Sequence, residues 1–560
     1  EDGDTVELKL ASIGMFKFPQ MLEESAKLFL QGRNDTKRVS IEIVTFNSTQ
    51  DLYNAIQIDI STTLLLAEEE EDGTSTAIVD EEDDDGLLDG NETETSTTPY
   101  SGYAMIPPSF LGDFYQAMAP LRTLLDSDVL PAFRNTLTVF GGTSYAFQMD
   151  GDIHTYFYRK DLLELFDRPV PETWDEYLET AEFFHNLEVD GVKLLGSCFG
   201  RKLNCIDSNF FWLHGILASI TQTQGPTQGS LFDTKTMEPL FGDALEETLR
   251  IMEQQLGYGF EQELDDCLDL QLEYFLNGTC VQTIYWGDAY SQHLGESSAL
   301  AGKLGMAPLP GSPIVLDRST KSLRQCDETL CPYGFQSDRN GLINRPSYAA
   351  FGGWMGAVSN LVDLEQQLLT EEFLAFVSSR EISKNYVINE ANGDSFFGSD
   401  PYRYSHLNVS AWVEKGYDRD SASEYLLLLQ QAFSNPNMAH DLRIPLSESF
   451  IKALDETVHY HLSKEGLISR QRTVTNATEQ WNALVQEYDN MHNDGSTLLE
   501  LYQKSQSYND TTIKLTVPPT PAPTNEEGAE NGGSTASSLL FNNHAIFLAG
   551  IFVMISVAWL

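Results

Sequence analysis

Residues 5–46 read TVELKLASIGMFKFPQMLEESAKLFLQGRNDTKRVSIEIVTF, and this stretch decides the class of fold. Apolar side chains alternate near both of its ends, as they do in β-strands, at Val6, Leu8 and Leu10 and again at Val39, Ile41 and Ile43. Between them, apolar residues share one face of a predicted helix, at Phe18, Leu22, Ala26 and Phe29. A strand, helix and strand at this spacing predict a parallel pair with a right-handed crossover.

The same mixture of elements continues along the chain. Thr173-x-x-Glu176 forms a capping-box sequence and predicts a helix start, with apolar residues from Trp174 to Phe184 on one side. Further helices are predicted at 109–126, 243–255, 364–378, 422–433, 447–462 and 476–491. Strands are predicted at 136–140, 281–286, 304–308 and 354–358. The sequence therefore predicts an α/β protein.

Residues 67–98 interrupt this pattern with 14 acidic residues and no basic one. Such composition is typical of a disordered surface loop. The segment contains one near-match to a calcium-binding loop, at Glu81, Asp83, Asp85, Gly86 and Glu92. No amphipathic helices flank it, and acidic stretches produce such matches by chance. We therefore predict no metal site and no cofactor.

The charge balance restricts the partners. The 560 residues include 84 acids and 34 bases, a net charge of −50. Nucleic acid and anionic lipid are excluded as partners, because their phosphates would be repelled. The charge permits cationic ligands, and otherwise serves solubility.

Cysteines and glycosylation sequons indicate passage through an oxidising, glycosylating compartment. The six cysteines form three sequence-local couples, and we predict the pairs Cys198–Cys205, Cys267–Cys280 and Cys326–Cys331. Spacing alone allows 15 pairings, and some cysteines could instead be buried free thiols. Seven sequons occur, at Asn34, Asn47, Asn91, Asn277, Asn408, Asn476 and Asn509. We expect a secreted glycoprotein whose signal peptide has been removed.

The C-terminus predicts attachment to a membrane. Residues 545–560, AIFLAGIFVMISVAWL, carry no charge. A spanning helix needs about 20 apolar residues. Small residues at Asn531, Gly532 and Ser534 precede a polar spacer, which is the pattern of a GPI-attachment signal. A short C-terminal membrane anchor is the alternative. Residues 506–544 are predicted to form a disordered stalk rich in Pro, Thr, Gly and Ser.

Four segments, taken in order, resemble the family 1 extracellular solute-binding proteins, which include maltose- and oligosaccharide-binding proteins. YAFQMDGDIHTYFYRKDLL (145–163), with PVPETWDEYLETA after it, is similar to the family's first crossing, strand and P-x-T-W-x-E helix. FLNGTCVQTIYWGD (275–288) resembles its F-x-x-G-x-A-A-M…W strand, with Cys280, Val281 and Gln282 replacing the alanines and methionine. LGMAPLPG (304–311) and GGWMGAV (352–358) resemble its return crossing and its GGW motif.

The resemblance runs from residue 5 to about 490. It implies a type II periplasmic-binding-protein-like fold, with two Rossmann-like α/β lobes that close on a ligand about crossing hinge segments. Lobe I would comprise 1–148 and 304–400, and lobe II 149–303 and 401–505. The acidic segment, the disulfides and the anchor depart from bacterial relatives and indicate a eukaryotic, cell-surface version of these ABC-importer-type proteins.

The resemblance also implies ligand-binding residues. Trp286 and Trp354 match the family's cleft tryptophans, and Asp150 and Asp152 match positions that accept hydrogen bonds from sugar hydroxyls. Weaker candidates are Tyr145, Tyr402, Arg403 and Phe16. Each has another interpretation: a tryptophan near a strand end often belongs to the core, the aspartates can cap the next segment or be solvated, and Arg403 can pair with a surface carboxylate.

Motifs of catalysis are absent from the sequence. There is no GxSxG, HExxH, P-loop or GxGxxG, and His459 and His461 point to different helix faces. We therefore expect a monomeric, non-enzymatic protein that binds a small solute, most simply a sugar, for uptake or sensing at the outer cell surface. Its transporter or receptor partner is not identified. The alternatives are a structural or adhesive surface glycoprotein on the same fold, and a receptor for a cationic small molecule such as a polyamine.

Overall fold

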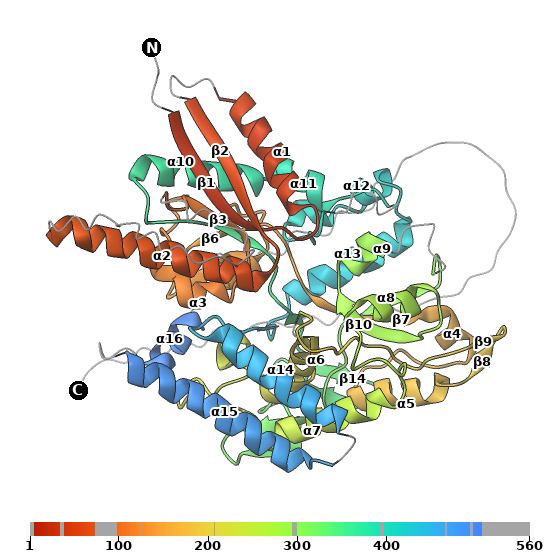
Figure 1. Cartoon of the computed structure of the whole chain (residues 1–560). Helices are drawn as coiled ribbons and strands as arrows, with labels where there is room; N and C mark the ends of the chain where they lie inside the picture. The colour runs from red at the N-terminus through yellow and green to blue at the C-terminus, as the bar shows by residue number, and fades with distance from the viewer. Residues whose placement is uncertain are drawn as a thin grey trace, which may run out of the picture. The chain divides into compact units, whose positions relative to one another are not determined.

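A computed structural model, shown in Figure 1, gives the fold. It describes residues 5–33, 38–72, 98–123, 125–206, 208–293, 300–391, 397–464, 467–492 and 497–506. No helix within these ranges is both long and apolar enough to cross a membrane. The predicted calcium-loop residues, the predicted hydrophobic tail and all of the predicted stalk except Gln506 lie outside the described residues.

A five-stranded sheet contains the opening strand–helix–strand unit. Its order is β2-β1-β3-β17-β6, and β1 is parallel to both β2 and β3, as predicted for the first pair. Strand β17 returns antiparallel to β3 and β6. The bounds are β1 Thr5–Ile13, β2 Arg38–Phe46, β3 Gly102–Ile106, β6 Ala146–Gln148 and β17 Met355–Val358.

Three helices pack on this sheet: α1 (Phe18–Gln31), α2 (Thr49–Asp72) and α10 (Leu364–Val377). Helices α1 and α10 also contact each other. Helix α2 corrects one prediction, because it continues to Asp72 through the start of the acidic segment that we expected to be a loop. The reason is the glutamate run that opens the segment, since glutamate is a good helix former.

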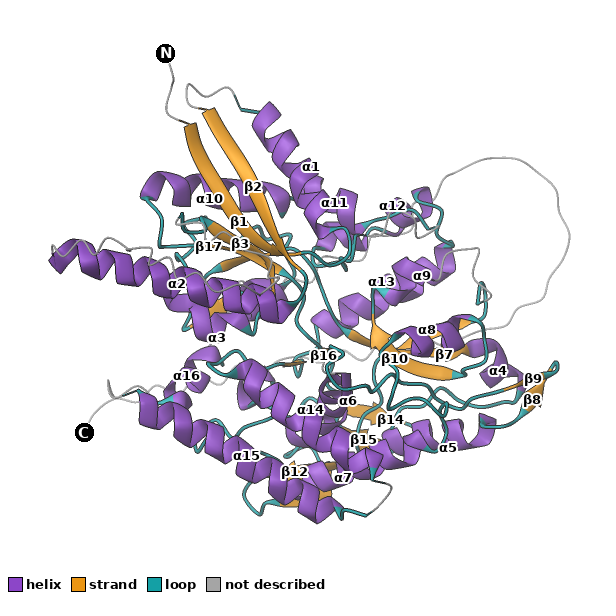
Figure 2. Ribbon diagram, in the orientation of Figure 1, coloured by secondary structure: helices purple, strands orange, loops and turns teal. Residues whose placement is uncertain are grey.

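A second sheet has three antiparallel strands in the order β10-β7-β11. Figure 2 shows its strands β10 and β7 side by side. The three strands are β7 (His154–Arg159), β10 (Gln282–Trp286) and β11 (Leu304–Ala307). Strand β11, which we had placed at the start of the second part of lobe I, thus belongs to the same sheet as β7. The division of the chain between the lobes otherwise stays a prediction.

A set of packed helices carries half of the buried residues of the second large apolar cluster. Helix α6 is buried at all of its positions, so it needs no amphipathic pattern and periodicity did not reveal it. These helices are α6 Ser208–Thr221, α7 Gly242–Leu256, α14 Ser447–Ser463, α15 Arg470–Met491 and α16 Leu498–Ser505. The remaining helices are α3 Phe110–Phe114, α4 Lys160–Leu165, α5 Trp174–Phe184, α8 Asp269–Leu276, α9 Ala289–His293, α11 Arg380–Val387, α12 Val409–Glu414 and α13 Arg419–Phe433.

Small hairpins and paired segments complete the described secondary structure. Their bounds are β4 Val139–Phe140, β5 Thr143–Ser144, β8 Glu188–Val189, β9 Val192–Lys193, β12 Ile314–Asp317, β13 Ser322–Gln325, β14 Phe335–Ser337, β15 Gly341–Ile343, β16 Tyr348–Ala349 and β18 Ala439–His440.

Prolines explain two wrong predictions of secondary structure. The helix expected over 109–126 is only α3 and one 3₁₀ turn ending at Ala117, because Pro120 cannot continue a helix. The strand expected over 136–140 begins instead as a helical turn, Phe133–Leu137, and only β4 is extended. Pro131 starts that turn, since its fixed φ favours the first helical position.

The disulfides correct two of the three predicted pairs. The bonds join Cys198 to Cys280, Cys205 to Cys267, and Cys326 to Cys331, of which only the last was predicted. The error came from pairing neighbours in the sequence. In the fold, residues 195–198 lie along the residues that lead into β10: Leu195 bridges Cys280, and the Cys198 N–H donates to the Gln282 carbonyl. This contact between distant segments decides the pairing.

Candidate functional site

A continuous series of aromatic side chains begins beside the five-stranded sheet. The rings of Phe16 and Phe18, at the start of α1, are 5.4 Å apart. Phe18 lies 5.5 Å from Trp354, and Trp354 lies 4.6 Å from Phe351, both just before β17. Phe16 is 48% exposed, whereas Trp354 is 5% exposed.

The series continues to the three-stranded sheet. Phe351 lies 6.3 Å from Phe211 of α6, and Phe211 lies 5.5 Å from Trp286 at the end of β10. Trp286 in turn lies 4.7 Å from His154 of β7, its partner in the strand register. We call Phe16, Phe18, Trp354, Phe351, Phe211, Trp286 and His154 the aromatic run. It joins the two sheets through edge-to-face contacts, and Trp286 and Phe351 keep part of their surface exposed.

Two local features position the run. Gly352 and Gly353 both have positive φ, and a Cβ at Gly353 would lie 2.5 Å from the Asp150 carbonyl oxygen. The tight turn before Trp354 therefore requires glycine. The Asp441 carboxylate accepts hydrogen bonds from the Phe351 N–H (2.7 Å) and the Tyr348 hydroxyl (2.6 Å), and so holds this loop.

Four carboxylates lie next to the run. Asp150 and Asp152 are between β6 and β7, Asp288 follows Trp286 by two residues, and Asp400 precedes Tyr402. We call them the four-aspartate cluster. Asp150 Oδ1 accepts hydrogen bonds from the Gly151 N–H (2.7 Å) and the Asp400 N–H (2.5 Å). The Tyr425 hydroxyl donates to Asp400 Oδ1 at 2.6 Å. The Trp354 N–H also donates to the Asp150 carboxylate, which links the cluster to the run.

Burial and mutual repulsion favour the protonated cluster. Burial raises the pKa of Asp150 to about 7 although backbone N–H groups oppose the shift, and it raises the pKa of Asp288 to about 7. Burial, followed by the neighbouring carboxylates, raises the pKa of Asp152 and of Asp400 well above the ordinary value. The Asp288 N–H and the Tyr425 hydroxyl partly offset the shift at Asp400.

Several buried polar atoms of this region have no hydrogen-bond partner among the described residues. Both ring nitrogens of His154 are unpartnered, although the residue is only 7% exposed. Burial lowers the pKa of His154 to about 3, so its ring is neutral and offers one donor and one acceptor. The other such atoms are Gln148 Oε1, Asp288 Oδ1, Ser399 Oγ and Asp400 Oδ2. Buried polar groups are normally paired, so this concentration indicates a place for a polar guest.

The structure assembles most of the predicted ligand residues. Trp286, Trp354 and Phe16 belong to the aromatic run, and Asp150 and Asp152 belong to the adjacent cluster. Whether they bind a ligand stays a prediction.

Three predicted residues lie elsewhere. Tyr145 packs against Tyr115, with ring centroids 6.1 Å apart. Tyr402 is fully buried and its hydroxyl lies 2.8 Å from that of Tyr386. Arg403 is 3% exposed and pairs with Asp126 (3.1 Å) and Asp128 (3.5 Å). These contacts give Tyr402 and Arg403 structural roles. Of the two partners of Arg403, Asp126 is 47% exposed, as the pairing with a surface carboxylate requires, and Asp128 is buried.

Sequence reasoning missed His154, Phe351, Asp288 and Asp400. Two of them carried a signal. His154 follows Asp152 by two residues at the start of a strand, so both point to the same side, and Asp288 lies two residues beyond Trp286. Asp400 had no signal, because only the tertiary fold brings it to Asp150.

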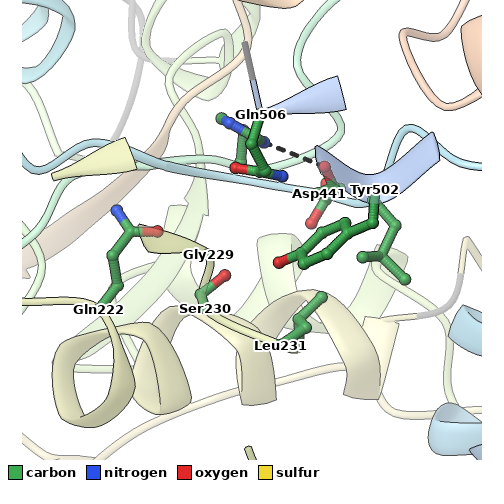
Figure 3. A pocket seen from close by; sticks show the side chains of 9 residues that line it. Gln222, Gly229, Ser230, Leu231, Asp441, Tyr502 and Gln506 are labelled. Atoms are coloured by element: carbon green, nitrogen blue, oxygen red, sulfur yellow. Dashed lines mark hydrogen bonds between the residues drawn. The ribbon is translucent and has the colours of Figure 1, made fainter. Parts of the chain in front are cut away.

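Ser230, His214 and Asp441 form a hydrogen-bonded Ser–His–Asp chain. Ser230 Oγ is 2.7 Å from His214 Nε2, and His214 Nδ1 is 2.8 Å from Asp441 Oδ1. Figure 3 shows Ser230 and Tyr502 pointing into the hollow beside this chain. The order of groups is that of a hydrolytic triad, but the hollow is too narrow to admit a water molecule. The hydrogen bonds from His214 and Ser230 therefore hold the Asp441 side chain in place and do not contact a substrate.

Comparison with known proteins identifies the fold. No protein-family model matches the chain. Maltose-bound MalE3 of T. maritima is 17% identical with a TM-score of 0.57, over 86% of this chain and 100% of that protein. A ribitol-bound ABC-transporter solute-binding protein of Agrobacterium radiobacter is 17% identical with a TM-score of 0.58, over 86% and 98%. A mannitol-bound solute-binding protein of Agrobacterium vitis is 15% identical with a TM-score of 0.53, over 87% and 99%.

These likenesses establish the fold of the chain as the two-lobed type II fold of the periplasmic binding proteins. This confirms the fold class that the sequence motifs predicted.

Proposed function

We propose that the protein is an extracellular receptor that binds a small polyhydroxylated solute, a sugar or a polyol, and closes its two lobes around it. One observation carries the proposal: the aromatic run connects the two sheets, and buried polar atoms without partners are concentrated beside it. The structural neighbours that bind maltose, ribitol and mannitol support the same class of solute.

The chemistry of the site suits such a solute. Aromatic faces pack on the C–H surfaces of a sugar, while a few fixed polar groups take its hydroxyls. Trp286 offers a partly exposed ring, and the neutral His154 ring next to it offers one donor and one acceptor. We propose binding without catalysis, because the sequence carries none of the catalytic motifs named above and the structural neighbours are binding proteins.

The proposal includes the location. The seven sequons support secretion and glycosylation, and Asn47, Asn277 and Asn408 are exposed as glycosylation requires. Asn476 is half-buried on α15, and Asn34, Asn91 and Asn509 lie outside the described residues. Three disulfides support an oxidising compartment. The hydrophobic end of the sequence supports anchoring at the outer cell surface, by GPI or by a short membrane segment.

The test is a thermal-unfolding screen of the full chain, produced in a glycosylating host, against maltose, ribitol, mannitol and related neutral solutes. A ligand at about 100 times its Kd stabilises the folded state by about 2.7 kcal/mol, which raises the Tm measurably. We expect Trp286→Ala to abolish this rise. The control Tyr460→Ala removes an exposed aromatic side chain of α14 and should leave the rise intact. A panel that leaves the Tm unchanged would refute a neutral polyhydroxylated solute.

A further inference from the structure

The four-aspartate cluster lacks the basic partners that buried carboxylates have elsewhere in the molecule. Among the described residues, no Lys, Arg or His forms an ion pair with Asp150, Asp152, Asp288 or Asp400. Other buried carboxylates have such partners: Glu263 pairs with Arg201 at 3.4 Å. Grouping four carboxylates without a cation is costly, because like charges in a low dielectric repel strongly.

A second observation shows where a guest would bind. Asp400 is fully buried, yet its Oδ2 atom has no hydrogen-bond partner among the described residues. This atom faces the turn after β10, since a Cβ at Gly287 would lie 3.1 Å from it. The next residue, Asp288, has an unpartnered Oδ1 of its own and is partly exposed. Two buried, unpaired carboxylate oxygens therefore lie at one turn, and Asp288 at this turn is partly exposed.

We propose that this turn binds an ammonium group of the solute, held by Asp288 and Asp400. The inference rests on the proposed solute-binding function and adds a positive charge to the solute: an amino sugar stays within the proposed class, whereas a polyamine would replace it. An ammonium group is a compact charge with three donors, which suits two unpaired carboxylates. Trp286, two residues before Asp288, offers a ring that attracts a cation or stacks on the carbon skeleton. No three His, Cys, Asp or Glu among the described residues are grouped as metal ligands, so an organic cation is the guest to test first.

The experiment compares amines with neutral molecules of the same shape. Binding to the full chain is measured by calorimetry for glucosamine against glucose and N-acetylglucosamine, and for 1,4-diaminobutane against 1,4-butanediol. We expect at least one amine to bind tenfold or more tightly than its neutral counterpart. The first set detects an amino-sugar site and the second a polyamine site.

Variants locate the site. Asp288→Asn removes one charge at a partly exposed turn, and we expect it to weaken binding of the amine tenfold or more. Asp338→Asn, at an exposed carboxylate of the β14–β15 turn, should have no effect. If Asp400→Asn folds poorly, the Asp288 variant still decides the result.

Each other outcome overturns the inference. Neutral sugars that bind as tightly as the amines would leave the proposed function standing and refute the ammonium site. The same holds if Asp288→Asn leaves amine binding unchanged. Saturable binding of Ca²⁺ that Asp288→Asn abolishes would identify a metal site instead. A chain that binds neither amines nor neutral solutes would refute both proposals.

Discussion

Two buried acidic regions of this protein are built in opposite ways. Around Asp128 the carboxylate is fully compensated: Arg403 lies 3.5 Å and Arg380 3.2 Å away, and the Ser405 hydroxyl donates at 2.6 Å. In the four-aspartate cluster the partners found within the described residues are the other carboxylates, backbone N–H groups and the Tyr425 hydroxyl.

The difference separates structural charges from charges kept for a guest. A compensated buried pair stabilises a fixed arrangement and has no capacity left for another partner. An uncompensated cluster reduces stability until something neutralises it, which natural proteins tolerate mainly at functional sites. The predictions below test this contrast.

The largest effect is expected when the compensated region is broken. Arg403→Ala leaves Asp128 buried with less compensation and should reduce the free energy of unfolding by about 3 kcal/mol. Urea unfolding measures the change, and the Kd of the folded fraction for its solute should stay constant. The matched control is Arg380→Ala, which removes an arginine that is 63% exposed and should cost about 1 kcal/mol or less. Equal losses would show that burial does not distinguish the two arginines.

An effect of opposite sign is expected at His154. His154→Phe replaces two unpartnered nitrogens by carbon and should leave the free protein as stable as before or up to about 2 kcal/mol more stable. Solute binding, measured by calorimetry, should weaken tenfold or more. His214→Phe is the matched control, because His214 is paired with Ser230 and Asp441 and its loss should cost about 1–3 kcal/mol. A destabilised His154→Phe would mean that its nitrogens have partners.

The pH dependence of stability tests the cluster. In the folded state Asp288 has a pKa of about 7, above the ordinary 3.8. The folded state therefore holds a proton that the unfolded state has lost, and stability falls as pH rises from about 4 to about 7. The nearby Tyr285 and Tyr425 stay neutral in this range, because burial raises the pKa of both.

Removing this carboxyl should remove its share of the pH dependence. We expect Asp288→Asn to be more stable than the parent, with a gain about 2 to 3 kcal/mol larger near pH 8 than near pH 5. Thermal unfolding at the two pH values measures this gain. Asp338→Asn should show no such difference, and a gain that is largest at low pH would contradict the raised pKa.

The smallest effect on stability is expected at the exposed end of the aromatic run. Phe16→Ala removes a side chain that is 48% exposed and should change the free energy of unfolding by less than about 1 kcal/mol. Solute binding should nevertheless weaken. Phe335→Ala, at 44% exposure in β14, is the control that should leave binding unchanged. Equal solute affinities for the two variants would show that Phe16 does not contribute to solute binding and that the binding part of the aromatic run begins at Phe18.

The sequence predicted those parts of the fold that depend on local periodicity. The β1–α1–β2 unit and its parallel pairing followed from alternating and helical apolar spacing. Helix α15 was predicted six residues short, because its first turns, from Arg470, carry few apolar residues and the Ser469 cap sets the start. The fully buried α6 carries no periodic signal at all.

The site was predictable only where a family motif covered it. Trp286, Trp354, Asp150 and Asp152 lay in such motifs, and the structure places them together. Asp400 and the two wrong disulfide pairs depend on contacts between distant segments, which neither spacing nor composition encodes. The sequence could not identify Asp128 as the buried partner of Arg403, because the two residues are 275 positions apart.

The close approach at Gly151 has a mechanical consequence. A Cβ there would lie 2.3 Å from the Pro401 carbonyl oxygen, and the Asp400 N–H donates to the carboxylate of Asp150. The segments around Gly151 and Pro401 are thus held together by close backbone packing and by a hydrogen bond. When the two lobes close on a solute, these two segments would therefore have to move together. Gly151→Ala would push the two segments apart and weaken this link without altering a residue of the aromatic run.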